Sequence, residues 1–479
     1  TTRLSRRDNR PKYLLTAPRN RSKFLLSANL VFALFARREL SAKHRRNKRV
    51  FKNEICRMSF RVLSAFLITA LTLAPVSQAA PVQLATSSPP EPALFTSKTE
   101  KNINHKDARL ARWVRSFRYR ALTSGIPAIT FEAAMRDVQY LEKVIELDRN
   151  QSEFTKTIWD YLDIAVATKR VTNGKTALHK WHKTLREIED RYQVEKAILV
   201  AIWGLESAYG EKRGDIPVIS ALATLAYDGR RGAFFEEQLI TALKILNNGD
   251  TTVPGMVGSW AGAMGHTQFM PTSYRDYAVD FTGDGKRDIW SDNPSDALAS
   301  TAAYLAEFGW TKGMPWGVEV RLPADFNYGL AQRRIKKRPS DWARAGVVSV
   351  TGKPIPDYGR AAVLLPAGAK GAAFLVFKNF EVLENYNSAD AYVIGVGHLA
   401  DRIVGGSKIK AKWPREDRAL SFAERQEMQR RLTSAGFNTQ GIDGKIGPLT
   451  IAAVRAFQRR VGLPADGYAS LQLLERLRR

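Results

Sequence analysis

Apolar residues recur at helical spacing over most of the chain from about residue 107 onward. In the segment ARLARWVRSFRYRALTSGI, Leu110, Trp113 and Phe117 fall on one side of a helix. The segments FEAAMRDVQYLEKVIEL and FTKTIWDYLDIAV repeat the pattern. Residues 172–246 continue it, up to an Asn-Asn-Gly sequence that is typical of a helix end. The pattern predicts a mainly α fold.

Two stretches depart from this pattern. Glycine is dense in residues 254–274, and the region of residues 318–387 contains short β-rich runs (GVEVRL, AAVLLPAG and AAFLVFKNFEVLENY) that Pro and Gly separate. Helical spacing then returns in SADAYVIGVGHLADRIVGG. Residues 407–418 have the composition of a linker. We therefore expect one large domain over residues 107–406, with a small β-rich insertion, and a compact C-terminal domain over residues 419–479.

The chain has 479 residues and a formal net charge of +27, which at first suggests a nucleic-acid partner. The charge is unevenly placed, because residues 1–57 hold 17 Lys or Arg and 3 Asp or Glu, a net charge of +14. Arg61 is the only charged residue of the next segment, residues 58–79. Residues 80–479 therefore carry the remaining +12.

The first methionine, Met58, opens the segment MSFRVLSAFLITALTLAPVSQA. It has a basic residue, Arg61, an apolar run of 12 residues (62–73) and small residues up to Ala79, which is the layout of a secretory signal peptide. A helix needs about 20 apolar residues to span a bilayer, so an uncleaved anchor is the weaker alternative.

The N-terminal region then divides into three parts. We expect residues 58–79 to be a cleaved signal peptide, residues 1–57 to be a non-native upstream extension, and residues 80–106, rich in Pro, Ser and Thr, to be a flexible leader. The only cysteine, Cys56, lies in the extension, so the mature chain would have neither a disulfide nor a thiol nucleophile. Export without disulfides favours the periplasm or cell envelope of a Gram-negative bacterium, with no transmembrane span in the mature chain.

One carboxylate interrupts an otherwise apolar run. Glu206 lies in EKAILVAIWGLESAYG, and if residues 193–209 form one helix, Ile202 and Trp203 share its face. Apolar neighbours remove water from a carboxyl group and raise its pKa. A carboxyl that stays protonated near neutral pH can act as a general acid on a glycosidic oxygen. The alternative is an ordinary Glu that is exposed or paired with an Arg.

The sequence around Glu206 resembles one enzyme family. GLESAYG, followed by GSWAGAMGHTQFMPTSY, an acidic loop and ENYN at residues 384–387, is similar to the membrane-bound lytic transglycosylase B family. The resemblance covers residues 107–406 and implies a lysozyme-like α+β catalytic domain of the soluble-lytic-transglycosylase type. Enzymes of this family cleave peptidoglycan between N-acetylmuramic acid and N-acetylglucosamine.

The resemblance also implies site residues. Glu206 matches the catalytic acid and base. The residues that match substrate-contacting or cleft positions are Ser259, Gln268, Tyr304, Tyr386, Asn387, Tyr392 and, as a weaker match, Tyr161. These types suit a glycan, because amides donate and accept as an N-acetyl group requires and tyrosines present flat faces to sugar rings. Taken alone, the small residues of AGAMG are equally consistent with tight helix packing.

Most glycosidases use two carboxylates. Near Glu206 the sequence offers Glu211, Asp215 and Asp228, none of them in a similarly apolar frame. The resemblance implies a route with one carboxylate, in which Glu206 protonates the leaving oxygen and then takes the proton of the muramic C6 hydroxyl. The product is a 1,6-anhydro sugar, no water is consumed, and no cofactor is required. A lysozyme-like hydrolase on the same scaffold is the alternative.

The acidic loop DFTGDGKRDIWSD begins at residue 280. Its candidate metal ligands, at positions 1, 3, 5, 7 and 9 of an EF-hand-like loop, are Asp280, Thr282, Asp284, the carbonyl of Lys286, and Asp288. Position 12 is Ser291 rather than a bidentate Glu, so Asp292 or Asp296 would have to replace it. A metal-free Asx-rich turn is the alternative. Members of the resembled family carry calcium in this loop, and we expect a weak calcium site with a structural role.

The C-terminal unit resembles the peptidoglycan-binding domain of many wall hydrolases, through QRRLTSAGF, DGKIGPLTIAAVRAFQ and GLPADG. Gln429 with Leu432, and Val454 with Phe457, mark helix faces. We expect three short helices, which in about 60 residues can form a small core. Such a domain holds an enzyme near an insoluble substrate and so raises its effective concentration.

Three functions compete on these grounds: a lytic transglycosylase that acts on peptidoglycan strands as a monomer, a lysozyme-like muramidase, and a non-catalytic protein that binds cell wall or nucleic acid. We expect no nucleic-acid partner, because the excess charge lies largely in residues 1–57 and no nucleic-acid-binding motif is present. The six histidines do not cluster at metal-binding spacing, and we expect His266 to be structural or to line the cleft.

Overall fold

The computed structural model describes residues 98–149 and 156–479. The expected upstream extension (1–57) and signal peptide (58–79) lie outside the described residues, as does most of the expected leader. None of the helices within the described residues is long and apolar enough to cross a membrane.

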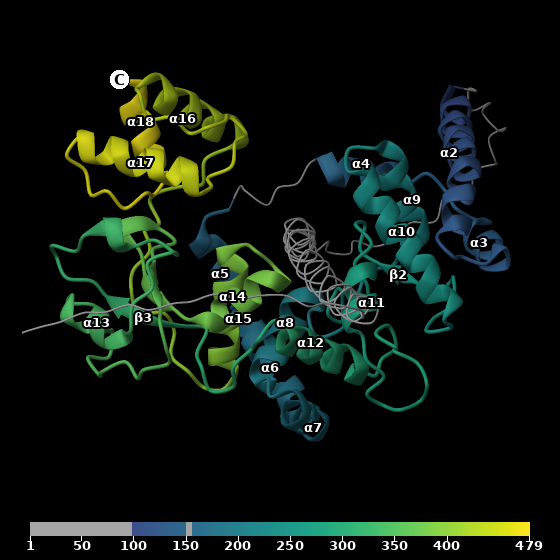
Figure 1. Cartoon of the computed structure of the whole chain (residues 1–479), viewed down its shortest axis with the longest axis horizontal. Coiled ribbons are helices and arrows are strands. Elements are labelled where there is room, and N and C mark those ends of the chain that lie inside the picture. Colours follow the sequence, from purple (N-terminus) through teal and green to yellow (C-terminus); the bar gives the residue numbers. More distant parts are fainter. Residues whose placement is uncertain (1–97, 150–155) are drawn as a thin grey trace, which may run out of the picture. The chain divides into compact units, whose positions relative to one another are not determined.

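The described part of the chain begins with a series of helices, most of them short (Figure 1). The first, α2 (Lys98–Thr123), starts inside the expected leader, because no proline interrupts it, and it buries Leu110 and Phe117 as the spacing predicts. The helices that follow are α3 (Ala128–Met135), α4 (Glu142–Arg149), α5 (Ile158–Ala165), α6 (Thr168–Lys180) and α7 (His182–Tyr192).

Helix α8 (Lys196–Ser207) is almost completely buried. Every residue after Lys196 is buried, because α6, α7, α12 and α15 pack against it. The helix is shorter than the expected 193–209, since Gln193 and Ala208 have positive φ angles of 56° and 50°. Left-handed residues end α7 and α8 and so divide the helical run that the sequence pattern predicts.

A second group of helices is built around α9 (Val218–Asp228) and α10 (Gly232–Asn247). Helix α10 packs on α9, on α3 and on α11 (Pro271–Tyr277), and Figure 1 shows α2 and α4 in the same group. Helix α12 (Ser295–Glu307) contacts both α11 and α8, so it joins the two groups. The glycine-dense segment runs from β2 (Val257–Gly258), which pairs with β1 (Ile216–Pro217), to α11.

The β-rich insertion forms a four-stranded antiparallel sheet of order β4-β3-β6-β5. The strands are β3 (Gly317–Arg321), β4 (Val348–Ser349), β5 (Ala362–Leu364) and β6 (Ala373–Val376), with short 3₁₀ helices η4 (Tyr328–Leu330) and η5 (Gly368–Lys370) between them. In the central pair, Val318 lies opposite Leu375. The core of the insertion packs around the fully buried Trp342 of α13 (Pro339–Arg344).

The run AAFLVFKNFEVLENY, expected to be β-rich, is a strand only in its first part. Its second part forms α14 (Lys378–Tyr386), because Phe380 and Leu383 bury one helical face. Helix α15 (Asp390–Ile403) follows, where helical spacing returns in the sequence. The mainly α fold with a small β insertion is confirmed.

Residues 407–418 contain no helix or strand, as a linker predicts, but they are held in place. The N–H groups of Lys410 and Ala411 donate to the Glu319 carboxylate at 2.9 Å and 2.7 Å. Arg415 forms a two-point contact with Asp163. The linker is therefore bound to the preceding domain at Lys410, Ala411 and Arg415.

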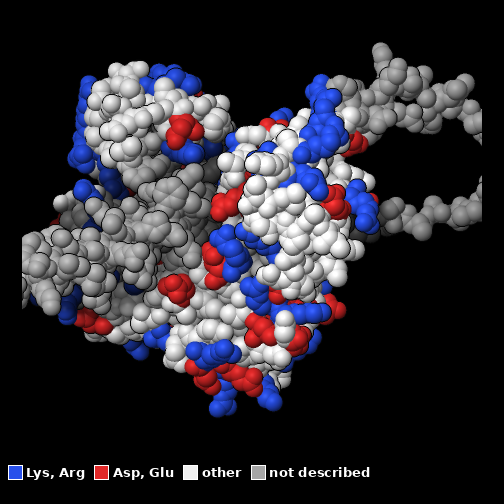
Figure 2. Space-filling model, turned by 45° about the vertical axis from the view of Figure 1, so that its right-hand side comes forward, with Lys and Arg blue, Asp and Glu red and all other residues white. Residues whose placement is uncertain are grey.

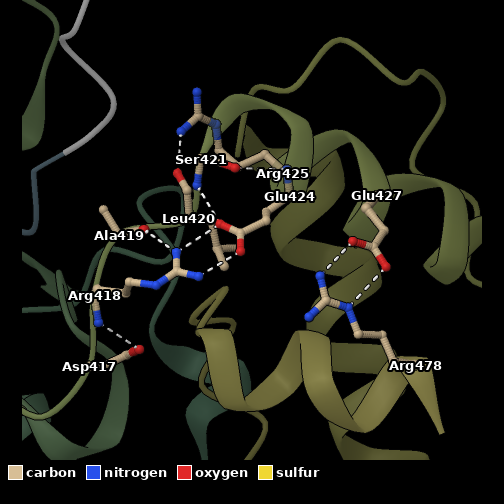
Figure 3. Close-up of polar contacts among 9 residues, drawn as sticks. All are labelled: Asp417, Arg418, Ala419, Leu420, Ser421, Glu424, Arg425, Glu427 and Arg478. Atoms are coloured by element: carbon tan, nitrogen blue, oxygen red, sulfur yellow. Dashed lines mark hydrogen bonds and ion pairs between the residues drawn. The ribbon is translucent and has the colours of Figure 1, made fainter.

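The C-terminal unit consists of α16 (Phe422–Ser434), α17 (Pro448–Arg460) and α18 (Leu471–Arg478), the expected three helices. Their core includes Met428, Leu432, Val454 and Leu474. Figure 3 shows the polar contacts at the start of α16. The Ser421 hydroxyl accepts the N–H of Glu424 at 3.2 Å, and the Glu424 carboxylate accepts the N–H of Ser421 at 2.8 Å, which is a capping box.

Charged side chains are mixed over much of the surface. Figure 2 shows acidic and basic side chains interspersed over the lower half of the face in view. In that lower half the charges do not form a patch of a single sign, which is the arrangement that long polyanions bind.

Replacing Ser421 by Ala should destabilise the C-terminal unit by about 1 kcal/mol, because the N–H of Glu424 loses its partner. Amide hydrogen exchange measured on the full chain should then be faster in α16 and unchanged in α8. The matched variant is Ser470→Ala, which removes the corresponding cap at Leu473 of α18. Unchanged exchange in α16 of Ser421→Ala would contradict the role of the cap.

Candidate functional site

Glu206 lies in the last turn of α8, immediately before a left-handed turn. Ala208, Tyr209 and Gly210 have φ angles of 50°, 64° and 90°, so the chain changes direction directly after the helix. The Tyr209 hydroxyl donates to the carbonyl of Arg170 on α6 at 2.7 Å and fixes this turn. Only 4% of Glu206 is exposed. The burial that the apolar frame predicts is confirmed.

The Glu206 carboxyl receives a hydrogen bond from α15. The Tyr392 hydroxyl donates to Glu206 Oε1 at 2.6 Å. Burial raises the pKa of Glu206 from 4.5 to about 8, although the Tyr392 hydrogen bond favours the charged form and lowers it. At neutral pH the group is therefore mainly protonated, as a general acid has to be.

Tyr386 and Tyr392 lie next to each other, close to the Glu206 carboxyl. Their rings are parallel within 3°, with centroids 6.5 Å apart. The Tyr386 hydroxyl donates to the carbonyl of Thr267 at 2.6 Å and so ties the end of α14 to the glycine-dense segment. Burial raises the pKa of both tyrosines well above 10, so both stay neutral hydrogen-bond donors.

Ser259 and Gln268 lie at two turns of the glycine-dense segment. The Ser259 hydroxyl accepts the N–H of Ala263 at 3.1 Å. Gln268 has a φ of 55°, and its amide nitrogen donates to the carbonyls of Arg213 and Gly265, both at 2.9 Å. The side-chain nitrogen of Gln268 therefore braces the loop, and its Oε1 is the atom that it can offer to an N-acetyl group.

Close backbone approach explains one glycine before this segment. A Cβ atom on Gly214, whose φ is 86°, would lie 2.2 Å from the carbonyl oxygen of Gly258. Only glycine permits this distance, so residue 214 packs directly against the chain that leads into Ser259.

Tyr304 packs beside the ring of Tyr386. It is completely buried on α12, and its hydroxyl donates to the carbonyl of Asn385 at 2.6 Å. Its ring packs against Phe269, Phe308 and Tyr386, which cover it on several sides. Tyr386 and Tyr392 are almost as buried as Tyr304, and the expected place of Tyr304 in the cleft stays a prediction.

Asn387 lies in the connection between α14 and α15, and Tyr161 lies on α5, which packs against α15. Asn387 follows the end of α14 and is buried, and its Oδ1 accepts the N–H of Ala389 at 3.0 Å. Tyr161 of α5 is half-buried and packs against Gly395, where a Cβ atom would lie 2.9 Å from the ring. Tyr161 and Tyr392 line the same cavity, of about 1100 Å³. Their expected contacts with a sugar stay predictions.

The other carboxylates near Glu206 in the sequence lie in different surroundings. Glu211 and Asp215 are exposed, and Asp228 pairs with Arg149 at 2.6 Å. Within the described residues, no second carboxyl is among the groups that shift the pKa of Glu206. Among the described residues, the structure therefore shows no second carboxyl that acts on Glu206.

The acidic loop brings three carboxylates together. Those of Asp280, Asp284 and Asp296 each offer an oxygen within 4.8 Å of the others. Of the two candidates for the last ligand, Asp296, at the start of α12, is therefore the one that lies with Asp280 and Asp284. Burial, with the nearby Asp280, raises the pKa of Asp296, although three backbone N–H groups bind it. Asp292 instead pairs with Arg213 at 2.9 Å.

The remaining expected ligands differ in their positions. The Thr282 hydroxyl lies 3.4 Å from the Asp280 carboxylate, and the backbone of Lys286 donates to Asp284 at 2.9 Å. The Asp288 carboxylate accepts the N–H groups of Trp290 and Ser291, at 2.8 Å and 3.0 Å. Asp288 therefore caps a turn and is not one of the three grouped carboxylates.

The chain matches the family described as the transglycosylase SLT domain over residues 109–401, and a peptidoglycan binding domain over residues 423–477. It is 31% identical over 295 residues to the membrane-bound lytic murein transglycosylase B of Escherichia coli (strain K12), covering 58% of this chain and 79% of that protein. The chain belongs to the SLT-domain transglycosylase family. The resemblance that the motifs carry is confirmed.

Solved structures of SLT transglycosylases share this fold. SltB3 from Pseudomonas aeruginosa, in complex with NAG-anhNAM-pentapeptide, is 49% identical with a TM-score of 0.76, covering 77% of this chain and 99% of that chain. Slt35 from Escherichia coli, in complex with calcium, is 27% identical with a TM-score of 0.53, covering 62% of this chain and 93% of that chain.

The sequence patterns did not predict the backbone carbonyls that bind the tyrosine hydroxyls around the SLT site. The carbonyls of Thr267, Arg170 and Asn385 accept the hydroxyls of three tyrosines. Every residue has a backbone carbonyl, so such acceptors leave no mark on the sequence.

Replacing Tyr392 by Phe should move the alkaline limb of the kcat/KM profile of this SLT enzyme to higher pH. The lost hydrogen bond favours the charged form of Glu206, so its removal raises the pKa further. We also expect kcat to fall by about 10-fold or more, because the carboxylate loses its orienting donor. The control is Tyr304→Phe, whose hydroxyl contacts Asn385, and it should leave the limb in place. An alkaline limb at the same pH in Tyr392→Phe would show that Tyr392 does not affect the pKa of Glu206.

Proposed function

We propose that the protein is a peptidoglycan lytic transglycosylase that cleaves the bond between N-acetylmuramic acid and N-acetylglucosamine without consuming water. The observation that carries this proposal is a single buried carboxyl, Glu206, with a pKa of about 8 and a tyrosine hydroxyl on its Oε1. Membership of the SLT-domain family supports the reaction class.

In the first step, protonated Glu206 gives its proton to the glycosidic oxygen, and the bond from that oxygen to C1 of the muramic sugar breaks. The N-acetylglucosamine part leaves with a free hydroxyl. The positive charge that develops at C1 is stabilised by the acetamido group of the substrate itself. No enzyme nucleophile is needed for this step.

In the second step, the Glu206 carboxylate takes the proton of the C6 hydroxyl of the muramic sugar while O6 bonds to C1. The product is a 1,6-anhydro ring, and Glu206 is protonated again. Between the two steps the carboxylate lies in an apolar site, where the 2.6 Å hydrogen bond from Tyr392 stabilises its charge. Over the cycle Glu206 gives up one proton and regains one, so the reaction balances.

The C-terminal unit is proposed to hold the enzyme on its insoluble substrate. It matches a peptidoglycan binding domain over residues 423–477, and SltB3 was solved with a peptidoglycan fragment. Binding to the wall raises the effective concentration of glycan strands at the site. The protein would then act in the cell envelope, where peptidoglycan lies, and the expected signal peptide over residues 58–79 would take it there.

Replacing Glu206 by Gln should abolish turnover of purified peptidoglycan, since the amide can neither give nor take the proton. Products of the unaltered enzyme, analysed by mass spectrometry, should lack the mass of one water relative to reducing muropeptides. Reducing muramic ends would instead identify a lysozyme-like hydrolase. Release of products at the normal rate by Glu206→Gln would remove Glu206 from the mechanism.

Folding of Glu206→Gln is checked by urea unfolding at two pH values. The folded-state pKa of Glu206, about 8, lies above its ordinary value of 4.5, so its contribution to stability is complete below pH 4.5 and is lost as pH rises through 8. Gln has no such loss. At pH 9 the variant should therefore be more stable than the unaltered protein, by at most about 5 kcal/mol.

We further propose that the acidic loop binds calcium in a structural role. Grouped carboxylates repel one another and a hard divalent cation relieves this, which fits Asp280, Asp284 and Asp296. Slt35 was solved in complex with calcium, and it shares the fold of this chain. These residues would hold the ion, and the proposed proton transfers by Glu206 do not involve it.

Calcium should raise the thermal midpoint of the full chain relative to a sample with chelator. At a concentration ten times Kd, the expected stabilisation is about 1.4 kcal/mol. Asp284→Asn and Asp296→Asn should lose this effect, whereas Asp292→Asn should keep it, because Asp292 pairs with Arg213 instead. Equal midpoints with calcium and with chelator in the unaltered protein would show an empty loop.

A further inference from the structure

His266 lies between the catalytic helix and the acidic loop. Only 2% of it is exposed. Its Nδ1 lies 3.0 Å from the indole nitrogen of Trp203 on α8, and its Nε2 lies 2.7 Å from the carbonyl oxygen of Ser291 in the acidic loop. The imidazole ring therefore bridges two segments that are far apart in the sequence.

The two partners assign the protonation state of the ring. An indole nitrogen can only donate, so Nδ1 of His266 carries no proton. A carbonyl oxygen can only accept, so Nε2 carries the proton. Burial also lowers the pKa of His266, which favours this neutral form. The Arg213 guanidinium is 3.2 Å from Nε2, but two donors cannot bond, and it donates to Ser291 and Asp292 instead.

The backbone of His266 makes a second contact with α8. The Ser207 hydroxyl donates to the His266 carbonyl at 2.6 Å. Trp203 is three residues before Glu206, and Ser207 is one residue after it. Trp203 and Ser207, which flank Glu206 on α8, are therefore both bound to His266. Trp203 binds the imidazole ring, and Ser207 binds the main-chain carbonyl.

The turn after α8 also rests on this ring. A Cβ atom on Gly210 would lie 2.6 Å from Cε1 of His266, so glycine is needed for the turn to pack there. The N–H of Gly210 donates to the Ser207 hydroxyl at 3.0 Å. The rotation of the last turn of α8, which aims Glu206 at the Tyr392 hydroxyl, is thus fixed by contacts with His266.

We propose that His266 is a positioning residue for Glu206: its bare Nδ1 anchors Trp203, and this anchor sets the orientation of the carboxyl toward the substrate. The proposal rests on the proposed function of Glu206 as the acid and base. His266 itself does not reach the reacting atoms. Its contact with Ser291 aligns the ring and links the acidic loop to α8.

Two substitutions separate the two ring contacts. In His266→Asn the amide oxygen takes the position of Nδ1 and can still accept from Trp203, but nothing reaches Ser291. In His266→Gln the amide nitrogen takes the position of Nε2 and can still donate to Ser291, but Trp203 loses its acceptor. Trp203→Phe removes the same hydrogen bond from the other side.

Turnover of soluble peptidoglycan fragments is measured for each variant, with thermal midpoints alongside. We expect His266→Gln and Trp203→Phe each to lower kcat by 10-fold or more with KM within about 2-fold, because the carboxyl is misaimed while sugar contacts remain. His266→Asn should retain kcat within about 3-fold. The double variant Trp203→Phe/His266→Gln should be no slower than either single variant, since both remove one interaction.

Equal losses in His266→Asn and His266→Gln, or a fall in the thermal midpoint with normal kcat, would overturn the proposal and leave His266 a purely structural residue. If His266→Gln does not fold, Trp203→Phe tests the proposal alone. A normal kcat in Trp203→Phe would then overturn it. The anhydro or reducing nature of the product is scored separately, so failure of the positioning role is distinguishable from failure of the proposed function.

Discussion

The structure of the catalytic part depends on keeping one ionisable carboxyl away from water. Burial disfavours the charged form of Glu206 and sets its pKa near 8, while the 2.6 Å hydrogen bond from Tyr392 opposes this effect. A buried carboxyl without a hydrogen-bond partner costs stability, and it costs far more when it is ionised. The donor lies 186 residues further along the chain, so α8 and α15 have to pack in one register for the site to exist.

The sequence predicted the parts of this arrangement that follow from local pattern. An unbroken apolar frame around Glu206 indicated both a helix and a buried carboxyl, and α8 has both. Local pattern was insufficient for Lys378–Tyr386, where apolar residues suit a strand or a helix and tertiary packing selects α14. In the acidic loop, spacing alone left Asp292 and Asp296 equivalent, and the ion pair of Asp292 with Arg213 separates them.

The remaining differences arise because sequence motifs do not show which polar atoms are already bonded. The hydroxyl of Tyr304 is bound to the carbonyl of Asn385. The amide nitrogen of Gln268 braces a loop, and the ring of His266 joins α8 to the acidic loop. Each partner is a backbone carbonyl or a residue distant in sequence. The polar residues near Glu206 thus hold the site rigid before any substrate arrives, which is the condition for preorganised catalysis.

Burial and the Tyr392 hydrogen bond together explain how one carboxyl could act first as an acid and then as a base, as the proposed mechanism requires. A general acid needs a pKa above the working pH, and burial supplies this for Glu206. A general base needs a stabilised carboxylate, and Tyr392 supplies it with a hydrogen bond that favours the charged form. The two influences act on opposite protonation states, so each form of Glu206 has one influence that stabilises it, and burial is the larger of the two. A second buried carboxylate would raise the pKa further by repulsion and would disturb this balance, so a single carboxyl is a physical advantage of the one-proton route rather than a missing part.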